Sequence, residues 1–126
     1  CKITLKTTEF NKLRGWLENN LIQVQETDKN KIILATEEIF TNIASYAYEN
    51  GVGPVEVSLQ IGENEIVLQF ADKGTPYNPL EHEDPDINAK IDERGIGGLG
   101  LLMVKNLMSS VEYEYKDGKN ILTLKY

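Results

Sequence analysis

The sequence predicts an α+β fold in two layers, in which helices cover one face of a mixed, mainly antiparallel sheet. Two pairs of strand-like segments, each joined by a short turn, indicate the antiparallel strands. Helical patterns precede and separate these pairs. Hairpins with helices gathered between them form an α+β sandwich. The chain has 126 residues, and we expect residues 1–126 to form a single domain.

The first expected elements are a strand and two helices. Residues 2–5 alternate in polarity and indicate a short strand. Residues 8–21 repeat apolar side chains at helical spacing. Asp28 is the expected N-cap of a longer helix, whose apolar stripe covers residues 32–47 and which should end at the Asn-Gly pair at 50–51.

Two hairpins and a third helix follow. Residues 55–61 and 66–70 alternate around a turn, and residues 111–115 and 121–126 do so around an Asp-Gly pair. A polar stretch from Lys73 to Arg94 separates the hairpins and leads to a helical pattern at Leu99–Leu107. A connection of this length inside a compact domain is usually functional or mobile.

Composition excludes several classes of function. The net charge of −7 argues against nucleic acid as the main partner, although a few local groups can still hold one nucleotide. The only cysteine is Cys1, which fits a reducing, cytoplasmic compartment, and the only histidine is His82, which excludes a metal site built on two histidines. No apolar run approaches the length that spans a membrane. The chain begins at Cys1 rather than Met, which fits a leader or neighbouring domain before it.

Glu38 and Asn42 lie four residues apart and therefore share one face of the expected helix. We expect both to be half-buried beside the apolar stripe, while Glu37 points to solvent. An amide oxygen such as that of Asn42 can ligate Mg²⁺, which completes its shell with waters and phosphates. A carboxylate one turn away can accept a proton from an attacking hydroxyl. The alternative is an ordinary solvated helix edge.

Asp72 continues the inward alternation of the preceding strand, so its carboxylate should face the core. Burying a carboxylate without partners is unfavourable. Because a carboxylate only accepts hydrogen bonds, an amino group such as that of adenine is a natural partner. Gly74 then allows a tight turn close to a planar ligand. The alternative is a turn in which Asp72 is rotated to solvent.

A glycine cluster precedes or opens the third helix: Gly95, Gly97, Gly98 and Gly100. Helix N-termini offer free N–H groups to phosphate, and Arg94 at the edge adds positive charge. The cluster matches neither a dinucleotide-binding fingerprint nor a P-loop. The alternative is a flexible loop or tight helix packing.

Asn120 lies on the same strand face as Leu122 and Leu124. A polar residue in this inward position is a candidate for a second adenine contact. An asparagine that simply flanks the turn is the more ordinary explanation.

The order of these segments resembles the GHKL ATPase superfamily over residues 8–126. The run at 72–80, Asp-Lys-Gly-Thr-Pro-Tyr-Asn-Pro-Leu, is most similar to the bacterial anti-sigma-factor serine kinases, which typically have Asp-x-Gly-x-Pro-Phe-Asp-Pro. The run at 97–108 resembles their second glycine box. The chain departs from that group at Tyr46, where a histidine is common, and at Ser109-Ser110, where Met-Asp often follows the helix.

The resemblance implies a Bergerat-type ATP-binding fold and a role for each candidate residue. Asn42 would bind Mg²⁺ and Glu38 would be the general base. Asp72 would bind the adenine amino group, with Gly74 in the turn beneath the base. Phosphate contacts would come from Gly98 and Gly100, and a lid would contain Gly95 and Gly97.

The implied function is an ATP-dependent protein-serine/threonine kinase that regulates transcription in bacteria. Its partners would be ATP or ADP, a sigma factor, and an anti-anti-sigma protein of the STAS type that it phosphorylates on serine. Homodimerisation is possible. The alternatives are a non-catalytic, nucleotide-gated binding module, the ATP-binding domain of a sensor histidine kinase, and a purely structural α+β domain.

Overall fold

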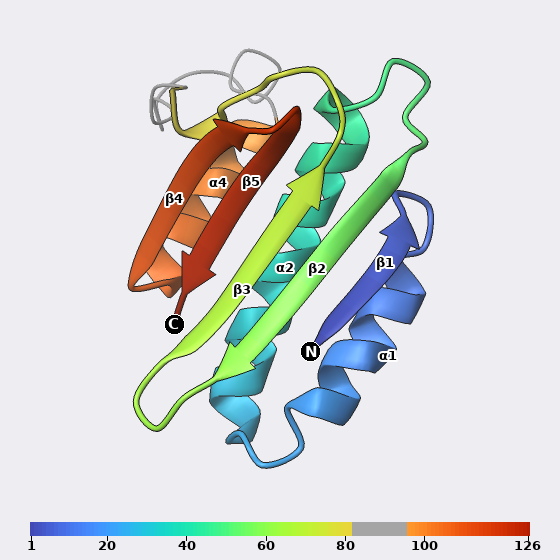
Figure 1. Ribbon diagram of the computed structural model, residues 1–126. Coiled ribbons are helices and arrows are strands. Elements are labelled where there is room, and N and C mark those ends of the chain that lie inside the picture. The colour runs from blue at the N-terminus through green and yellow to red at the C-terminus, as the bar shows by residue number, and fades with distance from the viewer. Residues whose placement is uncertain (82–95) are drawn as a thin grey trace.

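The computed structural model describes residues 1–81 and 96–126 and places them in two layers, a sheet and a set of helices (Figure 1). The predicted positions Arg94 and Gly95 lie outside the described residues. The sheet has five strands in the order β1-β2-β3-β5-β4. These strands are β1 (Lys2–Lys6), β2 (Pro54–Ile61), β3 (Ile66–Asp72), β4 (Ser110–Lys116) and β5 (Lys119–Lys125).

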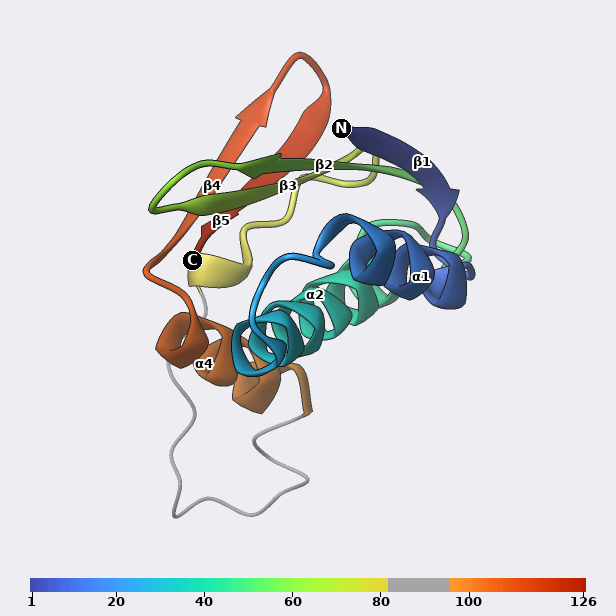
Figure 2. The ribbon, with the colours of Figure 1, turned by 90° about the horizontal axis from the view of Figure 1, so that it is seen from below.

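The helices α1 (Phe10–Asn20), α2 (Glu26–Tyr46) and α4 (Ile96–Leu107) lie on the same face of the sheet (Figure 2). A single 3₁₀ turn, η1 (Pro79–Glu81), follows β3. The long helix α2 runs beneath the middle of the sheet, between α1 and α4 (Figure 1). The predicted α+β fold with helices on one face is confirmed, and every strand pairing within the described ranges is antiparallel.

The inward face of the sheet is apolar along most of its length and becomes polar at one end. The alternate residues of β3 that are buried are Leu68, Phe70 and Asp72. In β5, the buried side chains of Leu122 and Leu124 continue the apolar face, and Asn120 pairs directly with Asp72 in the strand register. The core therefore ends in two neighbouring polar side chains, which are enclosed rather than exposed.

Two predicted helix boundaries of α2 were wrong. The helix begins at Glu26, so Asp28 lies within its first turn, where it accepts a hydrogen bond from the Tyr126 hydroxyl. The helix ends at Tyr46 rather than at residues 50–51. The Ala47 carbonyl instead accepts the N–H of Thr75 at 2.8 Å, so a contact with the segment after β3 takes the place of another helical turn.

The helix α4 begins at Ile96, three residues before the predicted start at Leu99. Gly97, Gly98 and Gly100 therefore lie inside the helix. Glycine has low helix propensity, which hides such a start when only apolar spacing is considered. The helix α4 packs against α2, and such tertiary contacts supply most of the stability of a helix with several glycines.

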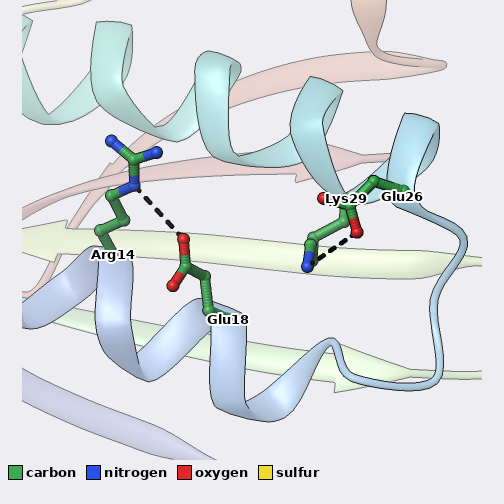
Figure 3. A network of polar contacts seen from close by, with 4 residues as sticks. All are labelled: Arg14, Glu18, Glu26 and Lys29. Carbon is green, nitrogen blue, oxygen red and sulfur yellow. Dashed lines mark hydrogen bonds and ion pairs between the residues drawn. The ribbon is translucent and has the colours of Figure 1, made fainter.

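Ion pairs at the surface of α1 and α2 lie away from the polar end of the core. Arg14 and Glu18 approach to 3.4 Å in α1, and Lys29 and Glu26 approach to 3.1 Å in α2 (Figure 3). Pairs of this kind contribute little to stability because solvent screens them. Among the described helices, none combines the length and the apolar character needed to cross a bilayer.

Candidate functional site

The polar end of the core is built around Asp72, the last residue of β3. Its side chain is buried, with 5% of the residue exposed. The Oδ1 atom accepts two hydrogen bonds, from the Asn120 amide nitrogen at 2.9 Å and from the Gly74 N–H at 2.9 Å. Within residues 1–81 and 96–126, no hydrogen bond reaches the other oxygen, Oδ2. One oxygen of a buried carboxylate is therefore left for a donor that the described residues do not supply.

Burial raises the pKa of Asp72, because the charged form loses its hydration. The hydrogen bonds from Asn120 and Gly74 oppose this effect and lower the pKa. The expectation that Asp72 faces the core is confirmed, and the alternative of a carboxylate rotated to solvent is wrong. A buried, partly satisfied carboxylate is an uncommon feature and often marks a functional site.

Asn120 is a hub of hydrogen bonds rather than a residue that merely flanks a turn. Its nitrogen donates to Asp72 Oδ1 and to the Thr75 carbonyl, both at 2.9 Å. Its oxygen accepts the Tyr77 N–H at 3.0 Å and the Tyr113 hydroxyl. These contacts connect β5 with the segment after β3 and with β4.

Asn42 and Asp72 line one cavity, which lies between α2 and the end of the sheet. Its apolar lining includes Ile39 and Ile43 of α2 and Ala47 just after that helix, and Tyr77 and Asn120 also line it. The pocket thus combines a largely apolar lining with a small number of polar groups, which is typical of a site for a small organic ligand.

Glu38 and Asn42 are both half-buried, as predicted, and Glu37 is exposed. The Glu38 carboxylate extends towards α4. A Cβ built at Gly100 would lie 2.0 Å from Glu38 Oε2 and 2.7 Å from its Cδ. The two helices therefore meet where a glycine leaves room for a carboxylate.

The glycines of α4 differ in what their backbone can offer. Gly97 and Gly98 lie in the first turn of the helix, where N–H groups have no partner within the helix and the dipole is positive. Gly100 lies beyond that turn, so its N–H belongs to the regular helical hydrogen-bond pattern. Gly97 and Gly98 could therefore contact an anion through the backbone, whereas Gly100 serves the packing of Glu38.

Gly74 is a point of close approach between the segment after β3 and the end of α2. A Cβ at this position would lie 2.1 Å from the Ala47 carbonyl oxygen and 2.6 Å from the Ala47 Cβ. Glycine is thus required by packing against α2, in addition to its place beside Asp72.

The tyrosines around this cavity were not identified from the sequence. Tyr77 stacks on Tyr46, with ring centroids 4.8 Å apart and 16° between the ring planes. Tyr113 reaches Asn120 from β4, and Tyr48 accepts the N–H of Lys73 through its hydroxyl oxygen at 3.0 Å. The position of Tyr77 five residues after a buried aspartate was the available signal, but nothing local links it to Tyr46.

Comparisons with known proteins identify the class to which this fold and site belong. The family model described as a histidine kinase-like ATPase domain matches residues 3–126. The chain belongs to this family. The histidine kinase AdeS of Acinetobacter baumannii has the same fold, with a TM-score of 0.52, 15% sequence identity, and coverage of 99% of this chain and 66% of that chain.

Two curated relatives share about 30% sequence identity with this chain over the aligned residues. The serine/threonine-protein kinase BtrW of Bordetella bronchiseptica is 29% identical over 112 residues, which cover 86% of this chain and 79% of the relative. The serine-protein kinase RsbW of Staphylococcus aureus is 31% identical over 99 residues, which cover 74% of this chain. The chain spans only 62% of the length of that second relative. The resemblance to anti-sigma-factor serine kinases of the GHKL superfamily is therefore confirmed at the level of family.

Proposed function

We propose that residues 1–126 form an ATP-binding domain that transfers the γ-phosphoryl group to a serine of a partner protein. The observation that carries the proposal is the buried Asp72, whose Oδ2 has no hydrogen-bond partner among the described residues, in a cavity that Asn42 also lines. Relatives named as serine-protein kinases support the reaction class.

The residues present fit a purine nucleotide with Mg²⁺. Asp72 would accept a hydrogen bond from the adenine amino group, against the apolar wall formed by α2. Asn42 would offer an amide oxygen to Mg²⁺, which would neutralise phosphate charge. Gly97 and Gly98 would donate N–H groups to the phosphates from the first turn of α4. Arg94 and Gly95, outside the described residues, remain predicted contacts.

Glu38 is proposed as the base that orients the attacking serine hydroxyl and accepts its proton. It lies one turn from Asn42 on α2, half-buried at the junction with α4. Phosphoryl transfer depends mainly on positioning and charge stabilisation, and little covalent work falls to the protein. A half-buried carboxylate beside the metal position meets that need.

The proposed partners follow the resemblance to anti-sigma-factor kinases. A STAS-type anti-anti-sigma protein would be the phosphorylated substrate, and a sigma factor would be the protein sequestered. A homodimer and a cytoplasmic location remain predictions of the same kind.

The test compares Glu38→Gln with Glu37→Gln, the matched change on the exposed side of the same helix. With radiolabelled ATP, Mg²⁺ and a candidate anti-anti-sigma protein, Glu38→Gln should lower transfer by roughly 10²–10⁴-fold, while ATP affinity is retained. Glu37→Gln should change neither quantity. Equal transfer by both variants would exclude Glu38 as the base. If the wild type binds ATP but transfers no phosphoryl group, the nucleotide-gated binding module is favoured.

A further inference from the structure

We propose that Asn120 is a positioning residue that makes the site selective for purines carrying a 6-amino group, and that it acts through Asp72 rather than by touching the base. This inference rests on the proposed function, in which Asp72 receives the adenine amino group. It replaces the expectation of a second, direct adenine contact by Asn120.

The hydrogen-bonding capacity of the Asn120 amide is already used within the protein. The two hydrogens of its nitrogen have acceptors in Asp72 Oδ1 and the Thr75 carbonyl, and a third acceptor, the Gly74 carbonyl, lies at 3.5 Å. Its oxygen accepts from the Tyr77 N–H and the Tyr113 hydroxyl. An amide has two donors and two acceptor lone pairs, so a direct contact with a base would break one of these bonds.

The contact with Asp72 decides which carboxylate oxygen a ligand can use. Asn120 and Gly74 both donate to Oδ1 and together leave Oδ2 for the ligand. Since Asp72 and Asn120 are directly paired across β3 and β5, the sheet itself holds the donor in place. The Tyr77 and Tyr113 contacts hold the amide in the orientation that directs its nitrogen at Asp72.

The same contact keeps Asp72 an acceptor. Donation to Oδ1 favours the charged carboxylate, which can accept from an amino group but cannot donate to a carbonyl group at the same position of the purine. Without the Asn120 donor, burial would favour the protonated carboxyl group, whose O–H can donate. Loss of Asn120 should therefore weaken discrimination between purines more than it weakens binding in general.

The experiment measures the ratio of two dissociation constants by calorimetry in the presence of Mg²⁺. The ligands are ATP and purine riboside 5′-triphosphate, which differ only in the 6-amino group. The ratio should be on the order of 10- to 100-fold in favour of ATP for the wild type, the range for a hydrogen bond to a charged group. In Asn120→Asp, which keeps the shape of the side chain but replaces its donor by an acceptor, the ratio should approach one. Asn30→Asp, the same change at an exposed position of α2, should leave the ratio intact.

Other outcomes separate this inference from the proposed function. If Asn120→Asp weakens both nucleotides equally or leaves the ratio unchanged, Asn120 has only a structural role and the inference is wrong. If the wild type binds neither nucleotide, the proposed function fails and the inference fails with it. If thermal unfolding shows that Asn120→Asp does not fold, the same ratio is measured in Tyr113→Phe. This variant removes the hydrogen bond from the Tyr113 hydroxyl that helps to orient the Asn120 amide. A partial fall of the ratio in that variant supports the inference, and an unchanged ratio overturns it.

Discussion

The Glu38 carboxylate lies against the backbone of Gly100, so that a Cβ at residue 100 would come within 2.0 Å of Glu38 Oε2. This contact joins α2, which carries the proposed base and metal ligand, to α4, whose first turn carries the proposed phosphate contacts. Glycine at residue 100 is therefore explained by the position of the Glu38 carboxylate.

Gly100→Ala should displace the Glu38 carboxylate and lower phosphoryl transfer at least tenfold, since small displacements of a catalytic group are costly. ATP affinity should fall less, because the Gly100 N–H lies within the helical pattern. A kinase assay run beside calorimetry on the same preparation checks this. The expectation fails if transfer is unchanged while a structure shows the methyl group at residue 100.

A matched control for this substitution exists in α1. Apart from the neighbouring residues and the backbone of α1 itself, no atom of the described residues lies within 4 Å of a Cβ at Gly15, so Gly15→Ala adds helix propensity without a clash. It should raise the free energy of unfolding by about 0.5–1 kcal/mol and leave transfer unchanged. Urea denaturation measures the free energy of unfolding of both alanine variants. Gly15→Ala shows the gain in helix propensity alone, whereas Gly100→Ala also displaces the Glu38 carboxylate.

Gly74→Ala should be destabilising, because its methyl group would meet the Ala47 carbonyl oxygen at 2.1 Å. Backbone atoms cannot turn aside as a flexible side chain can, so the segment beside Asp72 must shift. We expect a loss of about 1–3 kcal/mol in the free energy of unfolding, with weaker ATP binding. Chemical denaturation and nucleotide titration measure the two effects, and a variant as stable as the wild type would contradict the close packing seen here.

The stability of the protein should depend on pH through Asp72. Burial raises its pKa above the ordinary value of 3.8, so the folded protein holds this proton more tightly than the unfolded chain does. Asp72 therefore adds stability below that value, and the contribution is lost as pH rises through the higher folded pKa. The neighbouring tyrosines Tyr48 and Tyr77 have pKa values raised above 10.0 and do not titrate in this range.

Asp72→Asn provides the comparison, because an amide does not ionise in this range. The variant should gain stability relative to the wild type as pH rises from about 3 to about 7. Urea denaturation at several pH values measures the difference. A constant difference, or one that changes in the opposite direction, would show that the folded pKa of Asp72 is not raised.

Tyr46→Ala should loosen the segment that carries Tyr77 by removing the stacked ring. An aromatic pair contributes about 0.5–1.5 kcal/mol beyond its buried area, so ATP affinity should fall by up to about tenfold if this segment orders the pocket. Tyr46→Phe keeps the ring and should behave like the wild type. Tyr115→Ala, at an exposed tyrosine of β4, controls for loss of a surface ring. Equal nucleotide affinities in Tyr46→Ala and Tyr46→Phe would show that the ring pair does not order the pocket.

Much of this architecture follows from periodicity along the chain. Alternation in residues 55–61 and 66–70 correctly predicted β2 and β3, and its continuation correctly placed Asp72 on the buried face. Spacing of four along a helix likewise placed Glu38 and Asn42 together at half-buried positions. These features depend on local geometry, which a sequence displays directly.

The features that escaped prediction depend on contacts between distant segments. At the end of α2, the Ala47 carbonyl accepts the N–H of the distant Thr75, and α4, which begins at Ile96, packs against α2. The sequence places Asn120 on the inward face of its strand, but only the pairing of β3 with β5 brings Asp72 next to it. Tyr46 and Tyr77 lie in different elements, and only the folded chain places one ring on the other.

A calorimetric titration of the wild type and of Asp72→Asn with ATP and Mg²⁺ tests most directly whether Asp72 receives the base of a bound nucleotide. We expect saturable heat for the wild type and an affinity at least about tenfold weaker for the variant, since a hydrogen bond to a buried charge is lost. No binding heat from the wild type, or equal affinities for the two proteins, would contradict this role of Asp72.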